Sequence, residues 1–159
     1  MLKDKKDNRS INIIDILSTS NILNLHNINQ KKQLFTKIAD ICGKNINIPK
    51  SRFLSALLDK EDEENSGIGG GVAIPNIQMD ELNNMFGIFI KLNKSISFNS
   101  IDNEPVDIIF TLISPQNYHP IHLNILAFLS RLFTNKKNLK NLRASLDKET
   151  IYAILTTEL

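Results

Sequence analysis

The most apolar run in the chain, residues 106–113, constrains the fold more than any other segment. Val, Ile and Phe dominate this run, Pro105 precedes it and Pro115 follows it. A short, continuous apolar run of this kind is typical of a strand that is covered by other elements on both faces. The run therefore predicts the central strand of a sheet.

The rest of the chain predicts helices interleaved with shorter strands. Residues 85–92 alternate as a strand, and residues 72–74 form a brief strand after a glycine-rich turn. Apolar spacings of three and four predict helices over residues 29–43, from 49 into the acidic cluster 59–64, over 119–133 and 136–145, and from 147 onward. Residues 11–17 fit either a strand or a helical turn. We expect an α/β (α+β) domain over residues 11–159, with a mixed central β-sheet flanked by helices, after a disordered tail at residues 1–10.

Composition and charge exclude several classes of protein. The balance of 19 Lys and Arg against 17 Asp and Glu is too even to indicate nucleic-acid binding. No apolar run approaches the roughly 20 residues of a membrane span, and no signal-peptide pattern opens the chain, so we expect a cytoplasmic protein without membrane insertion. The single Cys42 excludes an internal disulfide and a cysteine zinc cluster. Asp102, Glu104 and Asp107 make only a weak case for a metal site, and we expect no metal and no cofactor.

Four stretches occur together in a recognisable order. They are the helix at residues 54–61, the glycine-rich segment SGIGGGVAIP at 66–75, FNSIDNEPVDIIF at 98–110 and HLNILAFLS at 122–130. Together they resemble the enzyme IIA domains of the phosphotransferase system, type 2, which comprise a mannitol and fructose branch and a nitrogen-regulatory branch. The resemblance extends from about residue 14 to the C-terminus, and the motifs are more similar to those of the nitrogen-regulatory branch.

The resemblance implies a phosphoryl-transfer site and a change in it. Members accept a phosphoryl group on a histidine from a histidine phosphocarrier protein, and nitrogen-regulatory members control partner proteins. The accepting histidine would follow Pro75, where this chain has Asn76, with Ile77 in place of the usual glycine. An imidazole lone pair can attack phosphorus, whereas the lone pair of an amide nitrogen is delocalised into its carbonyl. We therefore expect Asn76 not to accept phosphate.

Other candidate site residues also come from the resemblance. The family's arginine falls at Lys60, whose ammonium lacks the bidentate fork of a guanidinium. The second family histidine is retained at His122. Ser66, Gly69 and Gly71 could present a phosphate-facing loop, although a tight turn into a strand is the favoured explanation of the glycines. His119 and His26 are expected at the surface.

Two functions stay open at this point. The favoured one is a nitrogen-regulatory enzyme IIA-like pseudoenzyme that cannot accept phosphate and acts by binding partners, because Asn is neutral and close in size to histidine. The resemblance implies the histidine phosphocarrier protein, a sensor kinase or a potassium-transport component as partners. The alternative is an active phosphocarrier that accepts phosphate on His122. A decayed relic is disfavoured, because the helix and strand patterns are regular.

Overall fold

One mixed sheet forms the centre of the computed structural model, which describes residues 11–157; the tail expected at residues 1–10 lies outside this range. The strands run in the order β1-β5-β6-β3-β2, and β4 also pairs with β6. Pairing is antiparallel between β5 and β6 and parallel where β1 meets β5 and where β3 or β4 meets β6. The expected mixed sheet is confirmed, with strands β1 (Ile22–Leu25), β2 (Gly67–Gly69), β3 (Val72–Ala73), β4 (Asn76–Met79), β5 (Phe86–Ile96) and β6 (Val106–Pro115).

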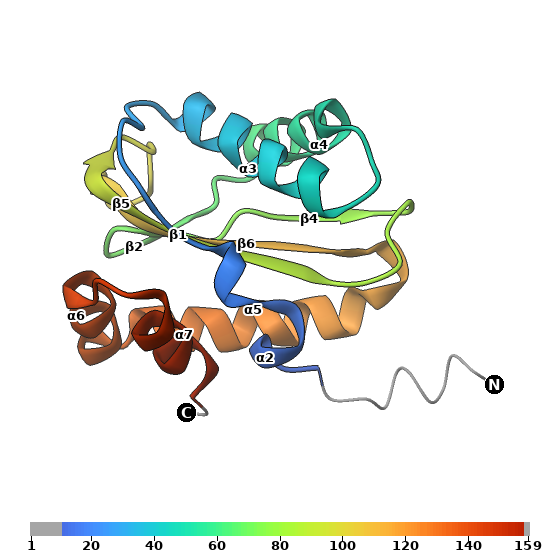
Figure 1. The fold of residues 1–159 in the computed structure, drawn as a ribbon. Coiled ribbons are helices and arrows are strands. Elements are labelled where there is room, and N and C mark those ends of the chain that lie inside the picture. Colours follow the sequence, from blue (N-terminus) through green and yellow to red (C-terminus); the bar gives the residue numbers. More distant parts are fainter. Residues whose placement is uncertain (1–10, 158–159) are drawn as a thin grey trace.

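Helices cover both faces of the sheet (Figure 1). One layer contains α3 (Lys31–Asn45) and α4 (Lys50–Glu63), and the opposite layer contains α2 (Ile13–Ile16), α5 (His119–Thr134), α6 (Lys136–Ala144) and α7 (Lys148–Thr156). Short 3-10 turns, η1 (Thr19–Asn21) and η2 (Gln116–Tyr118), precede β1 and α5. Within residues 11–157, no helix has the length and apolar character needed to cross a membrane.

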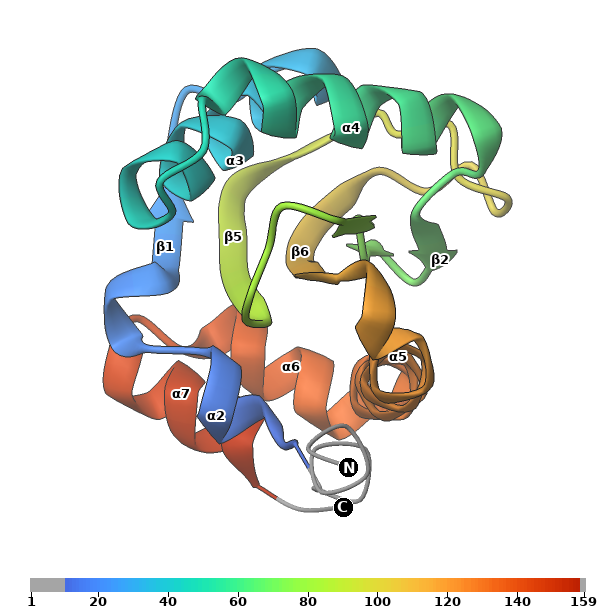
Figure 2. The same cartoon turned by 90° about the vertical axis from the view of Figure 1, so that its right-hand side faces the viewer.

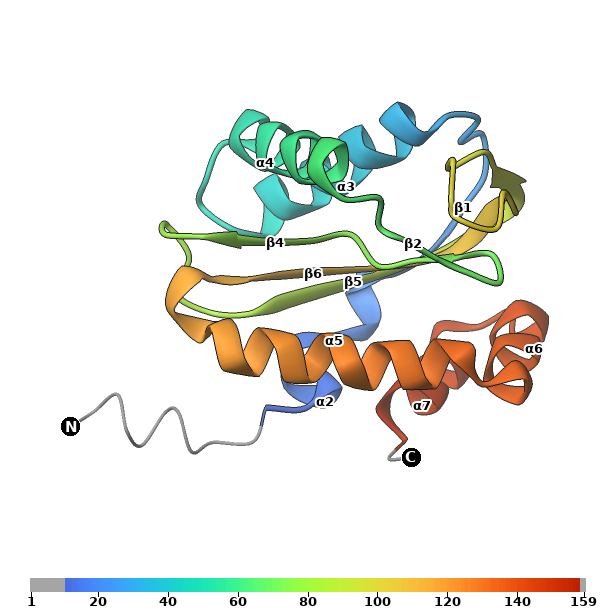
Figure 3. The ribbon, with the colours of Figure 1, turned by 180° about the vertical axis from the view of Figure 1, so that it is seen from behind.

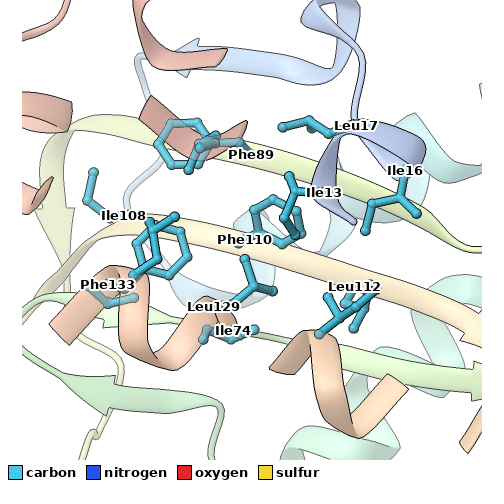
Figure 4. Packing of buried hydrophobic residues seen from close by; sticks show 14 of the residues in the cluster. Ile13, Ile16, Leu17, Ile74, Phe89, Ile108, Phe110, Leu112, Leu129 and Phe133 are labelled. Atoms are coloured by element: carbon cyan, nitrogen blue, oxygen red, sulfur yellow. The ribbon is translucent and has the colours of Figure 1, made fainter. Parts of the chain in front are cut away.

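Strand β6 is buried on both faces, as its apolar run predicts. Side chains at alternate positions point to opposite faces of a strand. Ile108, Phe110 and Leu112 belong to the cluster that α5 and its layer cover, and Figure 4 shows them beside residues such as Leu129 of α5. Ile109 and Ile113 join the cluster under α3 and α4. One strand therefore supplies both halves of the core.

The ambiguous segment and several boundaries are settled by the structure. Residues 13–16 form the helical turn α2, whose start is capped by Asn12. The first long helix begins after Gln30 rather than at Asn29, and it continues past Gly43 to Asn45. Gly43 does not end this helix; a Cβ there would lie 3.0 Å from Lys50 Cβ, so glycine lets α3 approach the start of α4.

Several strands differ from the prediction. β1 was not predicted as a strand, and β2 occupies part of the predicted glycine-rich turn. β5 continues to Ile96, four residues beyond the expected end, because it pairs again with β6 after a register shift. β4 was not predicted, because its four residues directly follow a proline and carry little strand signal of their own. Pairing with the long β6 supplies the hydrogen bonds that hold the short β4 in the sheet.

Lys91 joins β5 to the end of α6. Its Nζ donates hydrogen bonds to the carbonyl oxygens of Leu142 (3.1 Å), Arg143 (2.7 Å) and Ser145 (2.6 Å). Leu142 and Arg143 belong to the last turn of α6 and Ser145 follows it, where carbonyl groups lack partners within the helix. Burial lowers the pKa of Lys91, and the nearby Asp107 carboxylate opposes that shift. The ammonium is thus a C-terminal cap supplied by another element.

We expect Lys91→Met to lower the free energy of unfolding by about 1 to 3 kcal/mol, because three carbonyls lose a charged donor. Urea denaturation followed by circular dichroism measures this change. Lys94→Met is the matched control, since Lys94 lies on the same strand and is exposed. Equal stability of the two variants would contradict the capping role.

Candidate functional site

A cleft of about 360 Å³ opens at the edge of the sheet, between the C-terminal part of α4 and the N-terminal part of α5. Figures 2 and 3 show these helices on either side of the sheet edge that carries β2 and β4. The lining is polar at its centre and contains Lys60, Glu61, Glu64, Asn65, Ser66, Asn76, Gln78, His119, His122 and Ser130, with apolar residues such as Ile68 and Leu123.

The parallel register of β4 on β6 brings the central polar residues together. Asn76 pairs with Leu112, and Gln78 pairs with Ser114. Ile77 and Met79 alternate with the polar pair and are buried in the cluster under α3 and α4. Because successive side chains of a strand point to opposite faces, Asn76 and Gln78 point toward α5. One face of β4 therefore forms the cleft while the other belongs to the core.

His122 lies in the first turn of α5 and is only 3% exposed. Its Nε2 lies 3.0 Å from Asn76 Oδ1, and its Nδ1 is hydrogen-bonded to the Ser114 hydroxyl. Asn76 also donates from its amide nitrogen to the Ile74 carbonyl oxygen, at 3.0 Å. Burial, together with the positive charges of His119 and Lys60, lowers the pKa of His122 to about 4. The imidazole is therefore neutral near pH 7.

The rim of the cleft carries charges of both signs. His119 Nδ1 lies 3.1 Å from Gln78 Oε1, so His119 has a partner that its sequence context did not indicate. Lys60 Nζ lies 3.8 Å from a carboxylate oxygen of Glu64, a loose pair one helical turn apart. Glu61 accepts from the backbone N–H of Ser66 at 2.7 Å. This last contact fixes the start of the glycine-rich segment against α4.

The structure brings four of the predicted site residues to the cleft and leaves two outside it. Asn76, His122, Lys60 and Ser66 all line the cleft. Gly69 and Gly71 lie at the β2–β3 turn, where the atoms nearest to an added Cβ belong to Asp102, Asp107 and Arg143. These two glycines therefore do not line the cleft, and they lie beside a separate group of charged side chains.

The β2–β3 turn is held by ion pairs and backbone contacts. The N–H of Gly70 donates to Asp102 Oδ2 at 3.0 Å, and Arg143 donates to the carbonyl oxygen of Gly70 at 2.8 Å. Arg143 also forms a bidentate pair with Asp107. Gly71 has φ +81°, and a Cβ there would lie 2.5 Å from Arg143 Nη2. The turn thus requires glycine for conformation and for close approach.

Asp102 and Asp107, two of the three acidic residues in this region, have structural partners. Asp107 pairs with Arg143, and Asp102 accepts from backbone N–H groups of Gly70 and Glu104. Among residues 11–157, no group of three or more His, Cys, Asp or Glu side chains is arranged to hold a metal ion.

Sequence reasoning missed Ser114, Gln78 and the cleft position of His119. A polar serine at the end of an apolar run was the available signal for Ser114. His119 and His122 are three residues apart, a spacing that puts both on one face of a helix. For Gln78, only the register of β4 on β6 reveals its position.

The neutral state of buried His122 predicts a pH-dependent stability. The folded-state pKa of about 4 lies below the ordinary value of 6.5, so the unfolded chain binds more protons between these pH values. The contribution of His122 is complete above about pH 6.5 and falls as the pH drops toward 4, by roughly 2 to 3 kcal/mol. Urea unfolding of wild type and His122→Gln across this range should give a shallower pH dependence for the variant. His26→Gln, at an exposed histidine, should keep the wild-type slope.

The chain matches known proteins over nearly its whole length. The family model described as phosphoenolpyruvate-dependent sugar phosphotransferase system, EIIA 2, matches residues 15–158. The nitrogen regulatory protein of Bradyrhizobium diazoefficiens is 35% identical over 147 residues, which cover 90% of this chain and 94% of that protein.

Solved structures agree with the fold. The crystal structure of the nitrogen regulatory protein IIA-Ntr from Neisseria meningitidis superposes with a TM-score of 0.86 at 29% identity, covering 89% of this chain and 97% of that one. The crystal structure of IIA mannitol from Escherichia coli superposes at 0.73 with 15% identity, covering 87% and 98%, and supports the fold alone. From the family match and the similarity to nitrogen regulatory proteins, we conclude that the chain belongs to the EIIA 2 family of the phosphotransferase system.

Proposed function

We propose that this chain is a nitrogen-regulatory EIIA-type protein that accepts no phosphoryl group and acts through the partners that it binds. The observation that carries this proposal is the position of Asn76, at the centre of the cleft with Oδ1 3.0 Å from His122 Nε2. A carboxamide at this point cannot form and release a phosphorus–nitrogen bond under mild conditions, because its nitrogen lone pair is delocalised. In this proposal, Asn76 stands where family members carry the phosphate-accepting histidine.

The neutral amide of Asn76 means that phosphorylation does not change the charge of the cleft at this position. A phosphoryl group would add about two negative charges at this surface and three strong acceptor oxygens. Without it, partners meet a surface that resembles the unphosphorylated form of a relative. Asn76 thereby supports a constant regulatory signal rather than a switched one.

Apolar side chains at the rim support partner binding. Leu123 is 50% exposed and Ile68 is 40% exposed, and both line the cleft. Exposed apolar side chains beside a polar cleft give a partner protein apolar surface to cover together with polar groups to contact. Candidate partners are the histidine phosphocarrier protein and regulated proteins such as a sensor kinase or a potassium-transport component.

The alternative function is a phosphocarrier that uses His122. The observation in its favour is that His122 lies in the cleft, in hydrogen-bonding contact with Asn76. Its neutral imidazole at pH 7 is the protonation state that a nucleophile needs. Phosphoryl-transfer assays separate this alternative from the main proposal.

We expect wild-type protein to stay unlabelled when incubated with radiolabelled phosphoenolpyruvate and the upstream phosphotransferases, because Asn76 offers no nucleophile. Acid-labile, base-stable label on wild type would contradict the proposal. Label that disappears in His122→Ala and persists in Asn76→Ala would establish the alternative.

Asn76→His should acquire labelling, alone or with Lys60→Arg, whose guanidinium can hold a phosphate bidentately. Ile77 is left unchanged in this test, since it is 4% exposed and glycine there would remove part of the core. The matched control is Asn76→Gln, which changes the side chain without adding a nucleophile. Labelling of Asn76→His but not of Asn76→Gln would indicate that the scaffold is intact and only the acceptor is missing.

We expect Leu123→Asp to weaken binding of the histidine phosphocarrier protein by about tenfold or more, since an apolar contact at the cleft becomes a desolvated charge. Isothermal titration with the purified phosphocarrier measures this change. Ile14→Asp is the control, because Ile14 is 59% exposed on α2, away from the cleft. Equal affinity of the two variants would argue against this face as the binding surface.

A further inference from the structure

Three side chains from three elements form a continuous hydrogen-bonded chain that runs from the cleft into the core. Asn76 comes from β4, His122 from α5 and Ser114 from β6. Both ring nitrogens of His122 are engaged, Nε2 by Asn76 and Nδ1 by Ser114. Ser114 is fully buried and His122 nearly so, so bulk water does not compete for these bonds.

The backbone fixes which way the Asn76 amide faces. Its nitrogen lies 3.0 Å from the carbonyl oxygen of Ile74, which can only accept a hydrogen bond. The amide NH₂ must therefore point at Ile74, and Oδ1 must point at His122. A flipped amide would place two acceptors, the carbonyl oxygens of Asn76 and Ile74, against each other.

An amide oxygen accepts and never donates, so the nitrogen of His122 that faces it must carry the hydrogen. That nitrogen is Nε2, 3.0 Å away. In a neutral imidazole the other nitrogen, Nδ1, then holds the lone pair. The Ser114 hydroxyl, which can rotate to suit, donates to this lone pair. Burial of the ring opposes the doubly protonated form.

We infer that Asn76 holds His122 as the neutral Nε2–H tautomer, as a positioning residue that acts through the ring, while the Ser114 hydroxyl donates to Nδ1. This inference rests on the proposed function, and it adds the reason why the remaining histidine of the cleft does not replace the missing acceptor. The ring presents an N–H donor to the cleft. Its lone pair points away from the cleft, into contact with β6.

The consequence for phosphoryl chemistry is geometric. Attack on phosphorus requires a ring lone pair that a phosphoryl donor can reach in line. Nε2 is reachable from the cleft but carries hydrogen, and Nδ1 has the lone pair but is covered by Ser114. The bond to Asn76 selects this tautomer, because the Ser114 hydroxyl can either donate to Nδ1 or accept from it.

Nuclear magnetic resonance of the full ¹⁵N-labelled chain tests the inference directly, because the chain has three histidines. Long-range couplings between the carbon-bound ring protons and the ring nitrogens distinguish a nitrogen that carries hydrogen from one that holds a lone pair. We expect a single Nε2–H tautomer for His122 at about pH 7. The exposed His26 gives the reference for a ring free to exchange. A lone pair at Nε2 in wild type, or a mixture of tautomers there, would overturn the inference.

Variants separate the tautomer from simple packing. Ser114→Val should keep the Nε2–H form, because Asn76 still accepts from Nε2–H. Asn76→Ala should show at least about a tenfold larger Nδ1–H population, because no acceptor then selects the tautomer. An unchanged tautomer in Asn76→Ala would overturn the role of Asn76.

Reactivity gives a second readout that stands apart from the proposed function. Phosphoramidate, a small phosphoryl donor, should label His122 at least about tenfold faster in Asn76→Ala than in wild type, because Nε2 can then hold the lone pair. Equal rates would overturn the inference. Enzymatic labelling of wild type on another residue would refute the proposed function and leave the tautomer result intact.

Discussion

The parallel pairing of β4 with β6 is the contact on which the site depends. β6 is held from both faces by the two core clusters, so its position is fixed by burial. The short β4 has little tendency to form a strand alone and takes its register from β6. That register places Asn76 and Gln78 beside Ser114 and under the first turn of α5. A slip of one residue would send Asn76 into the core and Ile77 into the cleft.

The cleft and the glycine-rich segment are separate pieces of structure with a common boundary. Glu61 fixes Ser66 at the start of the segment, while Arg143 and Asp102 hold its far end. The glycines serve conformation at that far end, where α6 contacts the turn. Lys91 in turn caps α6, so the turn, the helix and β5 support one another. The polar lining of the cleft comes from α4, β4, α5 and the residues 65–66, and Ser114 of β6 bonds to it through His122.

Local patterns in the sequence predicted the parts of the fold that depend on local physics. The apolar run of β6 and the helical spacing of α5 each predicted an element that the structure contains. The helix predicted from residue 147 onward begins after Asp147, whose side chain accepts from the backbone N–H of Thr150. β4 escaped prediction because its strand character comes from a partner some 36 positions later in the chain. The bond between Ser114 and His122 was equally invisible, since it joins the end of a strand to the turn of a helix.

The candidate site was predicted unevenly for the same reason. Resemblance to a family identified Asn76, His122, Lys60 and Ser66, which line the cleft. It also proposed Gly69 and Gly71, whose neighbours are Asp102, Asp107 and Arg143.

The alternation along β4 has an evolutionary consequence. Ile77 and Met79 anchor the strand from one side, so a substitution at Asn76 or Gln78 leaves those core contacts in place. Mutations can therefore alter the chemistry of this cleft while the packing that holds β4 is inherited unchanged.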